Sequence, residues 1–173
     1  MKENFEVDIN KLTEEEKEKF LELVEKTKAE TISKPIGKRW KGKKNDAYYS
    51  ITSEGDLVDD VENESAYDDS CYQFGNYFKT IDEADFAREK HFTYQQLSDY
   101  ALEHNTEAIN WNNDYSSKFC IAYDYQNNKL FIDDMQTVKY PNTVYFTSER
   151  IAENAIKKIG ENNIKYYLFG IED

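Results

Sequence analysis

The sequence is poor in the residues that most enzyme motifs and small scaffolds need. Its 173 residues include only two Cys, two His, two Pro and six Gly. Two Cys are too few for a disulfide framework, and the glycines form neither a G-x-G-x-x-G nor a P-loop pattern. No run approaches the roughly 18 apolar residues of a membrane span, and the first residues lack the apolar run of a signal peptide. We therefore expect a cytoplasmic protein without disulfides.

Metal-binding and nucleophilic patterns are missing as well. Cys71, His91, His104 and Cys120 lack the short pairings of a zinc site. Neither histidine is accompanied by a Ser or Cys nucleophile elbow. We expect buried, apolar thiols and structural histidines. The sequence thus predicts no catalytic residue, no metal and no cofactor, and the protein is expected to be non-enzymatic.

Negative charge and aromatic side chains are abundant instead. Thirty-five Asp and Glu stand against 22 Lys and Arg, which gives a net charge of −13 and a pI near 4.7. There are 14 Tyr, 10 Phe and two Trp. A tyrosine has a large apolar body and a polar tip, so we expect a core rich in aromatic residues. The overall charge opposes long-range attraction of nucleic acid.

Two segments of the chain are similar to each other. Residues 77–90 align without a gap on residues 145–158, sharing the pattern Y-F-x-[TS]-x-x-x-A-x-x-A-x-x-K at an offset of 68. Trp40 and Trp111 also stand at similar distances before hairpin-like patterns. Self-similarity of this kind indicates a repeated structural unit. The sequence therefore predicts a tandem duplication, with residues 1–91 and 92–173 as two units packed in one compact body.

Each unit is predicted to be a helix, a three-stranded antiparallel sheet and a second helix, which makes an α+β fold. Turn-forming residues at 53–56 and at 127–128 are each predicted to connect the two strands of a hairpin. The third strand is expected through Tyr72, Phe74 and Phe78 in the first unit, and through Val144 and Phe146 in the second. Capping and spacing patterns predict helices over 13–29, 80–91, 93–104 and 148–160. A final apolar strand is expected over 164–171.

Charge is concentrated in two stretches of the first unit. Six carboxylates and no base fall in residues 59–69, and six bases and no acid fall in residues 31–45. The acidic stretch lacks the spacing of a calcium loop. It is typical of a solvated loop, but it also suits contact with a basic protein surface, with tyrosines as anchors. The predicted partner-binding residues are Asp59, Asp60, Glu62, Glu64, Tyr67, Asp68, Asp69 and Tyr72.

The basic stretch supports an alternative hypothesis. Bases around an aromatic side chain can bind a phosphate backbone while a nucleobase stacks on the ring. The alternative site for a nucleic acid or nucleotide consists of Lys38, Arg39, Trp40 and Lys43. A tryptophan before a hairpin is also typical of a core anchor, and we expect this role for both Trp40 and Trp111.

A series of short motifs is distributed over about residues 38–170. They are Lys38-Arg39-Trp40-Lys41, Tyr48-Tyr49-Ser50-Ile51, Phe74-Gly75-Asn76-Tyr77-Phe78-Lys79-Thr80 with Glu83-Ala84, Glu103-His104-Asn105, Ile109-Asn110-Trp111-Asn112 and Tyr145-Phe146-Thr147-Ser148. This layout resembles a family of uncharacterised phage and prophage proteins of Gram-positive bacteria. Gly42 stands where the first motif of that family usually has Pro. The resemblance implies an origin in a mobile element and supplies no catalytic residues.

These features together favour an acidic binding protein of phage or mobile-element origin. We expect it to inhibit a host defence nuclease, in an anti-CRISPR-like manner, by occupying a basic nucleic-acid-binding surface. The expected partner is a host protein with a basic surface, rather than a nucleic acid or a membrane. The apolar final segment also suits a homodimer. The protein would act in the cytoplasm of the host cell.

Overall fold

The computed structural model describes residues 13, 16, 17, 19, 39–113 and 115–171. The chain divides into two compact units, Met1–Trp40 and Lys41–Asp173. In the first unit the predicted capping box is present: the Thr13 N–H donates to the Glu16 carboxylate over 2.8 Å, and the Glu16 N–H donates to the Thr13 hydroxyl over 3.4 Å. The rest of the helix predicted over 13–29 lies largely outside the described residues.

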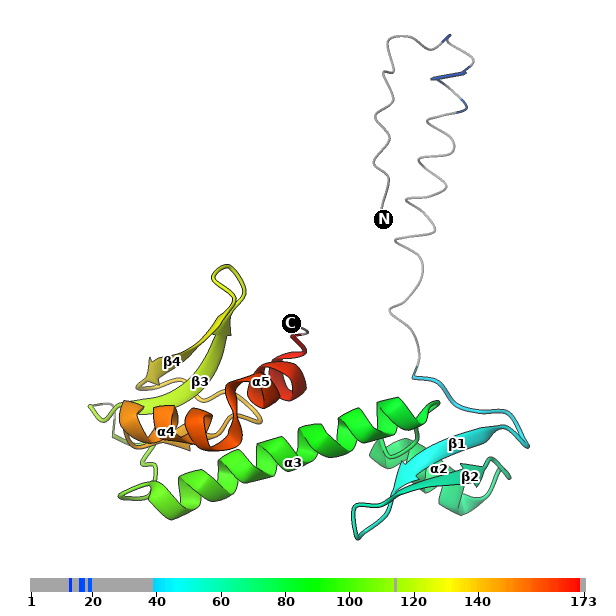
Figure 1. The fold of residues 1–173 in the computed structure, drawn as a ribbon, viewed down its shortest axis with the longest axis horizontal. Helices are drawn as coiled ribbons and strands as arrows, with labels where there is room; N and C mark the ends of the chain where they lie inside the picture. The colour runs from blue at the N-terminus through cyan, green and yellow to red at the C-terminus, as the bar shows by residue number, and fades with distance from the viewer. Residues whose placement is uncertain (1–12, 14–15, 18, 20–38, 114, 172–173) are drawn as a thin grey trace. The chain divides into compact units, whose positions relative to one another are not determined.

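The second unit has the predicted α+β class, with two small antiparallel sheets and several helices (Figure 1). The first sheet is the hairpin of β1 (Ala47–Ile51) and β2 (Leu57–Val61), in which Tyr49 pairs with Asp59 and Ser50 with Val58. Gly55 adopts a φ of +88° in the connecting turn, a conformation that a residue without Cβ adopts readily. The predicted hairpin is therefore confirmed.

The prediction of a third strand in the first half is wrong. The residues expected to begin that strand, Tyr72 and Phe74, lie in a helix. Ser65 begins α2 (Ala66–Phe74), which contains Tyr72 and Phe74. The Ser65 hydroxyl accepts the Asp68 N–H and the Asp68 carboxylate accepts the Ser65 N–H. This capping box satisfies N–H groups that would otherwise lack partners at the helix start. Only Phe78 extends the sheet, through a single antiparallel bridge to Tyr49.

The G-N dipeptide after α2 has a structural role. Gly75 ends the helix in the left-handed conformation, with a φ of +83°, which favours glycine. The amide side chain of Asn76 then binds both backbone groups of Ile51, accepting its N–H over 2.7 Å and donating to its carbonyl over 2.8 Å. Asn76 thus replaces a strand at this edge of β1 and holds the chain beside the hairpin.

One long helix, α3 (Ile81–His104), replaces the two helices predicted over 80–91 and 93–104. Thr80 caps its start as predicted, since its hydroxyl accepts the Glu83 N–H. Neither Gly nor Pro interrupts this stretch, and Thr93, predicted to begin a new helix, is buried within α3. The predicted division between residues 91 and 92 falls inside this helix. The same helix contacts β1 and β2, and also α4 (Glu149–Ile159) and η2 (Ile164–Leu168).

The second sheet has three strands in the order β4-β3-β5, namely β3 (Lys118–Asp124), β4 (Lys129–Met135) and β5 (Tyr145–Phe146). Phe119 pairs with Phe146, and Cys120 with Tyr145. Ser148 then begins α4, as predicted, with its hydroxyl accepting the Ile151 N–H. The three strands predicted for the second half are confirmed.

The predicted final strand over 164–171 is wrong. After the short helix α5 (Glu161–Asn163) the chain forms the π-helix η2. Helical spacing directs Ile164 and Leu168 to the same core, while Tyr166 packs edge-on against Phe86 of α3, with ring centroids 5.3 Å apart. Packing against α3 thus outweighs the strand preference of this apolar sequence. The segment offers no strand edge for pairing with a second copy.

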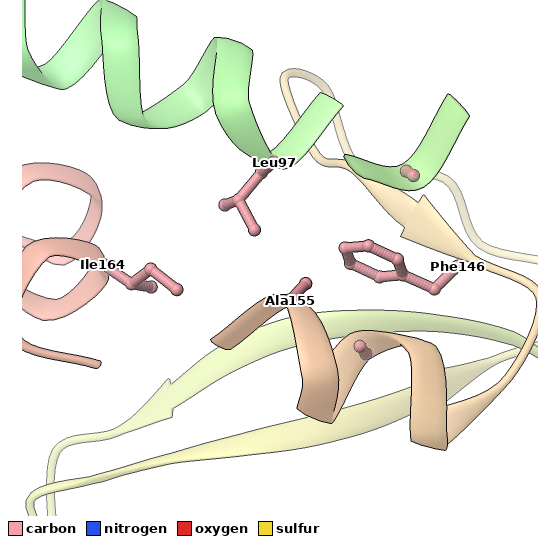
Figure 2. Close-up of a cluster of buried hydrophobic side chains, with 6 residues drawn as sticks. Leu97, Phe146, Ala155 and Ile164 are labelled. Carbon is pink, nitrogen blue, oxygen red and sulfur yellow. The ribbon is translucent and has the colours of Figure 1, made fainter. Parts of the chain in front are cut away.

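The main core lies where the C-terminal half of α3 meets α4, β5 and η2. Figure 2 shows Leu97, Phe146, Ala155 and Ile164 converging from these elements. Ala155 is fully buried, and its small side chain lets α4 approach its neighbours closely. A second buried group is aromatic, as predicted: Tyr48 and Tyr77 stack with ring centroids 4.0 Å apart. Both tyrosines are buried.

Candidate functional site

The predicted acidic residues follow one another from β2 into α2, but they differ sharply in burial. Asp59 and Asp60 lie in β2, and Asp68 and Asp69 lie in α2. Glu62 is only 1% exposed and Asp68 only 2%, whereas the other four have part or all of their surface in contact with solvent. The stretch is therefore not a solvated loop. Two of its carboxylates are buried inside the protein, and the other four are accessible to solvent.

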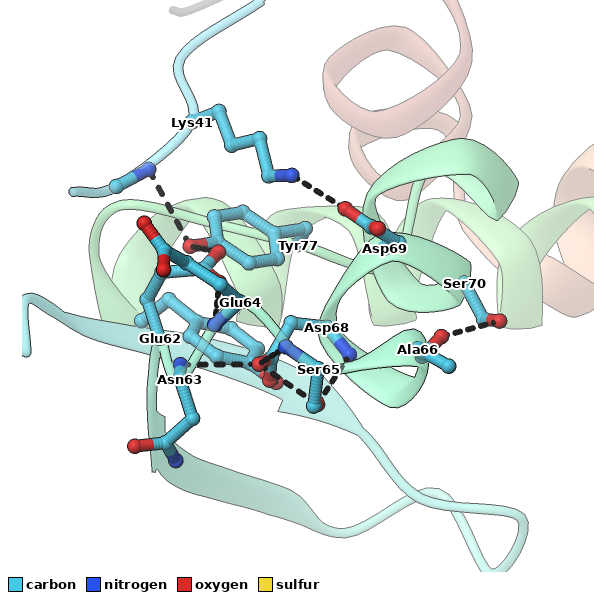
Figure 3. Close-up of polar contacts among 12 residues, drawn as sticks. Lys41, Glu62, Asn63, Glu64, Ser65, Ala66, Asp68, Asp69, Ser70 and Tyr77 are labelled. Atoms are coloured by element: carbon cyan, nitrogen blue, oxygen red, sulfur yellow. Dashed lines mark hydrogen bonds and ion pairs between the residues drawn. The ribbon is translucent and has the colours of Figure 1, made fainter. Parts of the chain in front are cut away.

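Asp68 holds α2 to the hairpin (Figure 3). One carboxylate oxygen accepts the Tyr48 hydroxyl over 2.9 Å, and the other accepts the N–H groups of Asn63 and Ser65, each over 3.0 Å, and the Ser65 hydroxyl over 2.8 Å. Burial by itself raises the pKa of this carboxyl, but the four donors outweigh it and hold the pKa well below its ordinary value. Asp68 is thus a structural anion, which corrects its predicted role in partner binding.

Glu62 is the second structural carboxylate. It accepts the Tyr77 hydroxyl over 2.8 Å and the Glu64 N–H over 2.7 Å. The same hydroxyl accepts the Gly42 N–H over 3.2 Å. Burial, and then the hydrogen bond to Glu62, raise the pKa of Tyr77 above its ordinary value. Because this carboxylate is enclosed and bonded internally, Glu62 also leaves the predicted contact set.

Two of the remaining carboxylates pair with the basic stretch. Lys41 Nζ lies 2.5 Å from Asp69 Oδ1, and Lys44 Nζ lies 3.8 Å from Glu64 Oε2. The hydrogen bond to Asp69 raises the pKa of Lys41. The acidic and basic stretches therefore neutralise each other in part. Within the described part of the chain, Asp59 and Asp60 form no ion pair.

One flank of α2 carries exposed aromatic side chains. Tyr67 is 58% exposed and Phe74 is 88% exposed, and they lie two helical turns apart on the same side of the helix. The thiol of Cys71, burial and the charge of Asp60 raise the pKa of Tyr67. We call the two exposed aromatic residues, Tyr67 and Phe74, together with the solvent-accessible acids of the segment from β2 to α2, Asp59, Asp60, Glu64 and Asp69, the α2 surface.

The two tyrosines predicted as aromatic anchors, Tyr67 and Tyr72, differ in their exposure to solvent. Tyr67 is on the surface, whereas Tyr72 is half-buried, edge-on to Tyr77 at 5.8 Å, with Lys41 Nζ 5.4 Å from its ring centre. Phe74 was not among the predicted site residues, because the alternation of Tyr72 and Phe74 placed it in a strand. The pattern S-x-x-D at 65–68 could have indicated the helix and thus the exposure of Phe74.

The structure describes three of the four residues of the alternative basic site. Lys38 lies outside the described residues. Arg39 and Trp40 end the first unit, and Lys43 belongs to the second, where its backbone N–H donates to Asp46 over 2.8 Å. Trp111, predicted to be a core anchor, is half-buried and packs edge-on against Tyr145, with Lys118 Nζ and Lys139 Nζ each 5.6 Å from its ring.

The two thiols and His104 show structural arrangements, whereas His91, also expected to be structural, has an exposed side chain within α3. Cys71 and Cys120 are both free and buried, and burial, followed by the charge of Asp133, raises the pKa of Cys120. The His104 ring stacks on Tyr100 at 3.9 Å, and its Nδ1 lies 3.0 Å from the Tyr100 carbonyl. Among residues 39–113 and 115–171, no group of three His, Cys, Asp or Glu side chains is placed to hold a metal. No helix of the described residues is long and apolar enough to span a membrane.

Comparison of the chain with protein-family models, with curated proteins and with solved structures finds no match. The resemblance of its motifs to phage and prophage proteins stays a prediction. The geometry of the α2 surface is therefore the main basis for a functional proposal.

Proposed function

We propose that this chain is a non-enzymatic protein that binds a basic surface of a partner protein through the α2 surface. The observation that carries the proposal is the exposure of both Tyr67 and Phe74 on one flank of α2, in an acidic part of the chain. Aromatic side chains are enriched at the centres of protein interfaces, where a few residues contribute most of the binding energy. They insert into apolar pockets, while the surrounding acids face Lys and Arg of the partner.

The charge of the second unit supports the same proposal. Residues 41–173 contain 25 acidic and 13 basic residues, a net charge of −12. Such a field accelerates encounter with a positively charged partner and slows encounter with nucleic acid. The ion pairs of Lys41 and Lys44 with Asp69 and Glu64 further weaken the basic stretch as a phosphate site. We therefore favour a protein partner over the alternative, nucleic acid.

The partner class that we propose is a nuclease of the host's defence system. A nuclease presents Lys and Arg along the channel that holds its nucleic acid, and an acidic protein can occupy that channel in place of phosphates. The motif resemblance to phage and prophage proteins supports this choice. On this proposal the chain acts in the host cytoplasm and competes directly with the nucleic acid of the nuclease.

We also propose that the two halves derive from a tandem duplication and that only the first has kept a binding surface. Three pairs of equivalent contacts, one of each pair in either half, support this proposal. Phe78 and Phe146 each pair with the first strand of the preceding hairpin. Thr80 and Ser148 each cap the helix that follows. The buried hydroxyls of Tyr77 and Tyr145 each accept a backbone N–H, from Gly42 and from Tyr140.

The proposal is tested by capture from a bacterial host lysate with three baits. They are the full chain, the variant Tyr67→Ser/Phe74→Ser, and the control Leu102→Ser/Tyr115→Ser, which removes two exposed apolar side chains elsewhere. Each anchor of this kind contributes about 2 kcal/mol or more, so losing the pair costs about 4 kcal/mol and weakens binding by roughly 700-fold. We expect a protein that the full chain and the control retain and that the first variant loses. Equal retention by all three baits would contradict the proposal.

A further inference from the structure

A cavity of about 560 Å³ lies beside α3, well separated in sequence from the α2 surface. Its walls come from α3, from residues 142–144 before β5, and from η2. Side chains of the main core, Leu97, Phe146 and Ile164, form part of its lining. This volume is in the range of pockets that bind small molecules. Its apolar lining suits a hydrocarbon or aromatic body.

The rim of the cavity is basic. Ala87, Lys90, His91, Tyr94 and Leu97 of α3 all line it, and the spacing of three and four residues places them along one side of the helix. Lys90 and His91 are exposed. The side chain of neither residue forms an ion pair or a hydrogen bond with another residue of the described ranges. Two nitrogen-bearing side chains therefore stand without partners at the opening.

The absence of acid from the lining is unusual for this protein. Twenty-five of the residues from 41 to 173 are acidic, yet none of the 13 residues that line the cavity is Asp or Glu. Low-dielectric walls strengthen the pairing of an anion with a nearby base. One wall is the π-helix, which contributes Ile164 and Leu168. Single π-turns within helical segments are frequent at functional sites.

We propose that this cavity binds a small amphipathic anion. The apolar body of the ligand packs against Tyr94, Val144 and Leu168, which line the cavity and are only partly buried, and its single anionic head group pairs with Lys90 and His91. A carboxylate and a phosphate monoester share the chemistry that these two side chains recognise. The site shares no residue with the α2 surface, so it stands independently of the proposed binding of a partner protein.

Calorimetric titration of the full chain with three eight-carbon probes tests the proposal. The probes are octanoate, octyl phosphate and 1-octanol, which share one apolar body and differ in the head group. We expect at least one anion to bind about tenfold more tightly than the alcohol, a difference of about 1.4 kcal/mol. The tighter anion identifies the head group. Equal affinity for all three probes, or no binding of either anion, would overturn the proposal.

Variants locate the site. Lys90→Gln/His91→Gln changes exposed side chains only, so it should fold normally and lose the roughly tenfold preference for the anion. Lys158→Gln removes a base of α4 that does not line the cavity and should keep that preference. Ala87→Trp should fill the opening and weaken all three probes. If the double variant keeps the preference, the head group does not bind at Lys90 and His91, and the proposal is wrong.

Discussion

Replacing the buried carboxylate of Asp68 with an amide should destabilise the second unit strongly. In Asp68→Asn, the amide oxygen can take the place of the carboxylate oxygen that accepts from Asn63 and Ser65. Those three bonds then become neutral, and neutral bonds are roughly half as strong as bonds to a carboxylate. The amide NH₂ group turns toward Tyr48, so the tyrosine hydroxyl loses its acceptor. The substitution keeps the shape of the side chain and removes the charge.

The expected cost follows from the four bonds. A hydrogen bond to a charged group contributes about 1.5–3 kcal/mol, so halving three and losing the fourth costs about 4–7 kcal/mol. Domains of this size are stable by only about 5–15 kcal/mol. The melting temperature should therefore fall by about 10 °C or more. The neighbouring Asp69 provides a matched control: its ion pair with Lys41 is partly exposed, and Asp69→Asn should cost less than about 1 kcal/mol.

Urea unfolding of both variants at pH 7 and at lower pH measures this effect. The folded-state pKa of Asp68 lies below its ordinary value, so its contribution is complete above about pH 4, the ordinary value. The contribution is lost as the pH falls from there toward the folded-state pKa. The free energy of unfolding should therefore decrease less on acidification for Asp68→Asn than for the wild type and Asp69→Asn. Equal stability of the two variants at pH 7 would refute the role assigned to Asp68.

Further predictions concern the core and the surface. Ile164→Ala should cost about 2–5 kcal/mol in urea unfolding because Ile164 is fully buried; a cost below 1 kcal/mol would contradict its place in the core. Phe74→Ser should change the unfolding free energy by less than about 0.5 kcal/mol because the ring is exposed, and a larger loss would mean that Phe74 supports the fold. Cys71 and Cys120 are buried, so a thiol reagent should react with them only at the rate of unfolding; rapid labelling of the native protein would contradict this burial.

Local signals in the sequence predicted much of the fold. Thr13, Thr80 and Ser148 begin helices as predicted, because a hydroxyl at a helix start satisfies a backbone N–H whatever the tertiary contacts are. The turns at Gly55 and around 127–128 end strands for similarly local reasons. The predicted acidic segment did include Tyr67, an exposed residue of the α2 surface.

The errors occurred where tertiary packing decides. The apolar segment from Ile164 to Leu168 has strand-like composition, but contact with α3 makes it helical. The sequence also does not distinguish structural from exposed acids, because burial of Glu62 and Asp68 depends on where Tyr77 and Tyr48 place their hydroxyls. The cavity beside α3 was not predicted, since its walls come from segments distant in sequence.

The most direct test of the proposed function is the salt dependence of binding to the captured partner. The dissociation constant should be measured from low to physiological salt for the wild type and for two variants. Each variant removes four negative charges, but from a different part of the surface. The first, Asp59→Asn/Asp60→Asn/Glu64→Gln/Asp69→Asn, neutralises the α2 surface. The second, Asp99→Asn/Glu103→Gln/Glu107→Gln/Glu153→Gln, neutralises exposed acids elsewhere.

Exposed charges act over about 10 Å at 0.1 M salt, so acids at the interface should matter more than equal charge placed elsewhere. We expect the first variant to bind at least about tenfold more weakly at low salt and to show a flatter salt dependence, while the second keeps nearly wild-type behaviour. If the two variants bind equally well, the α2 surface does not contact the partner's basic surface.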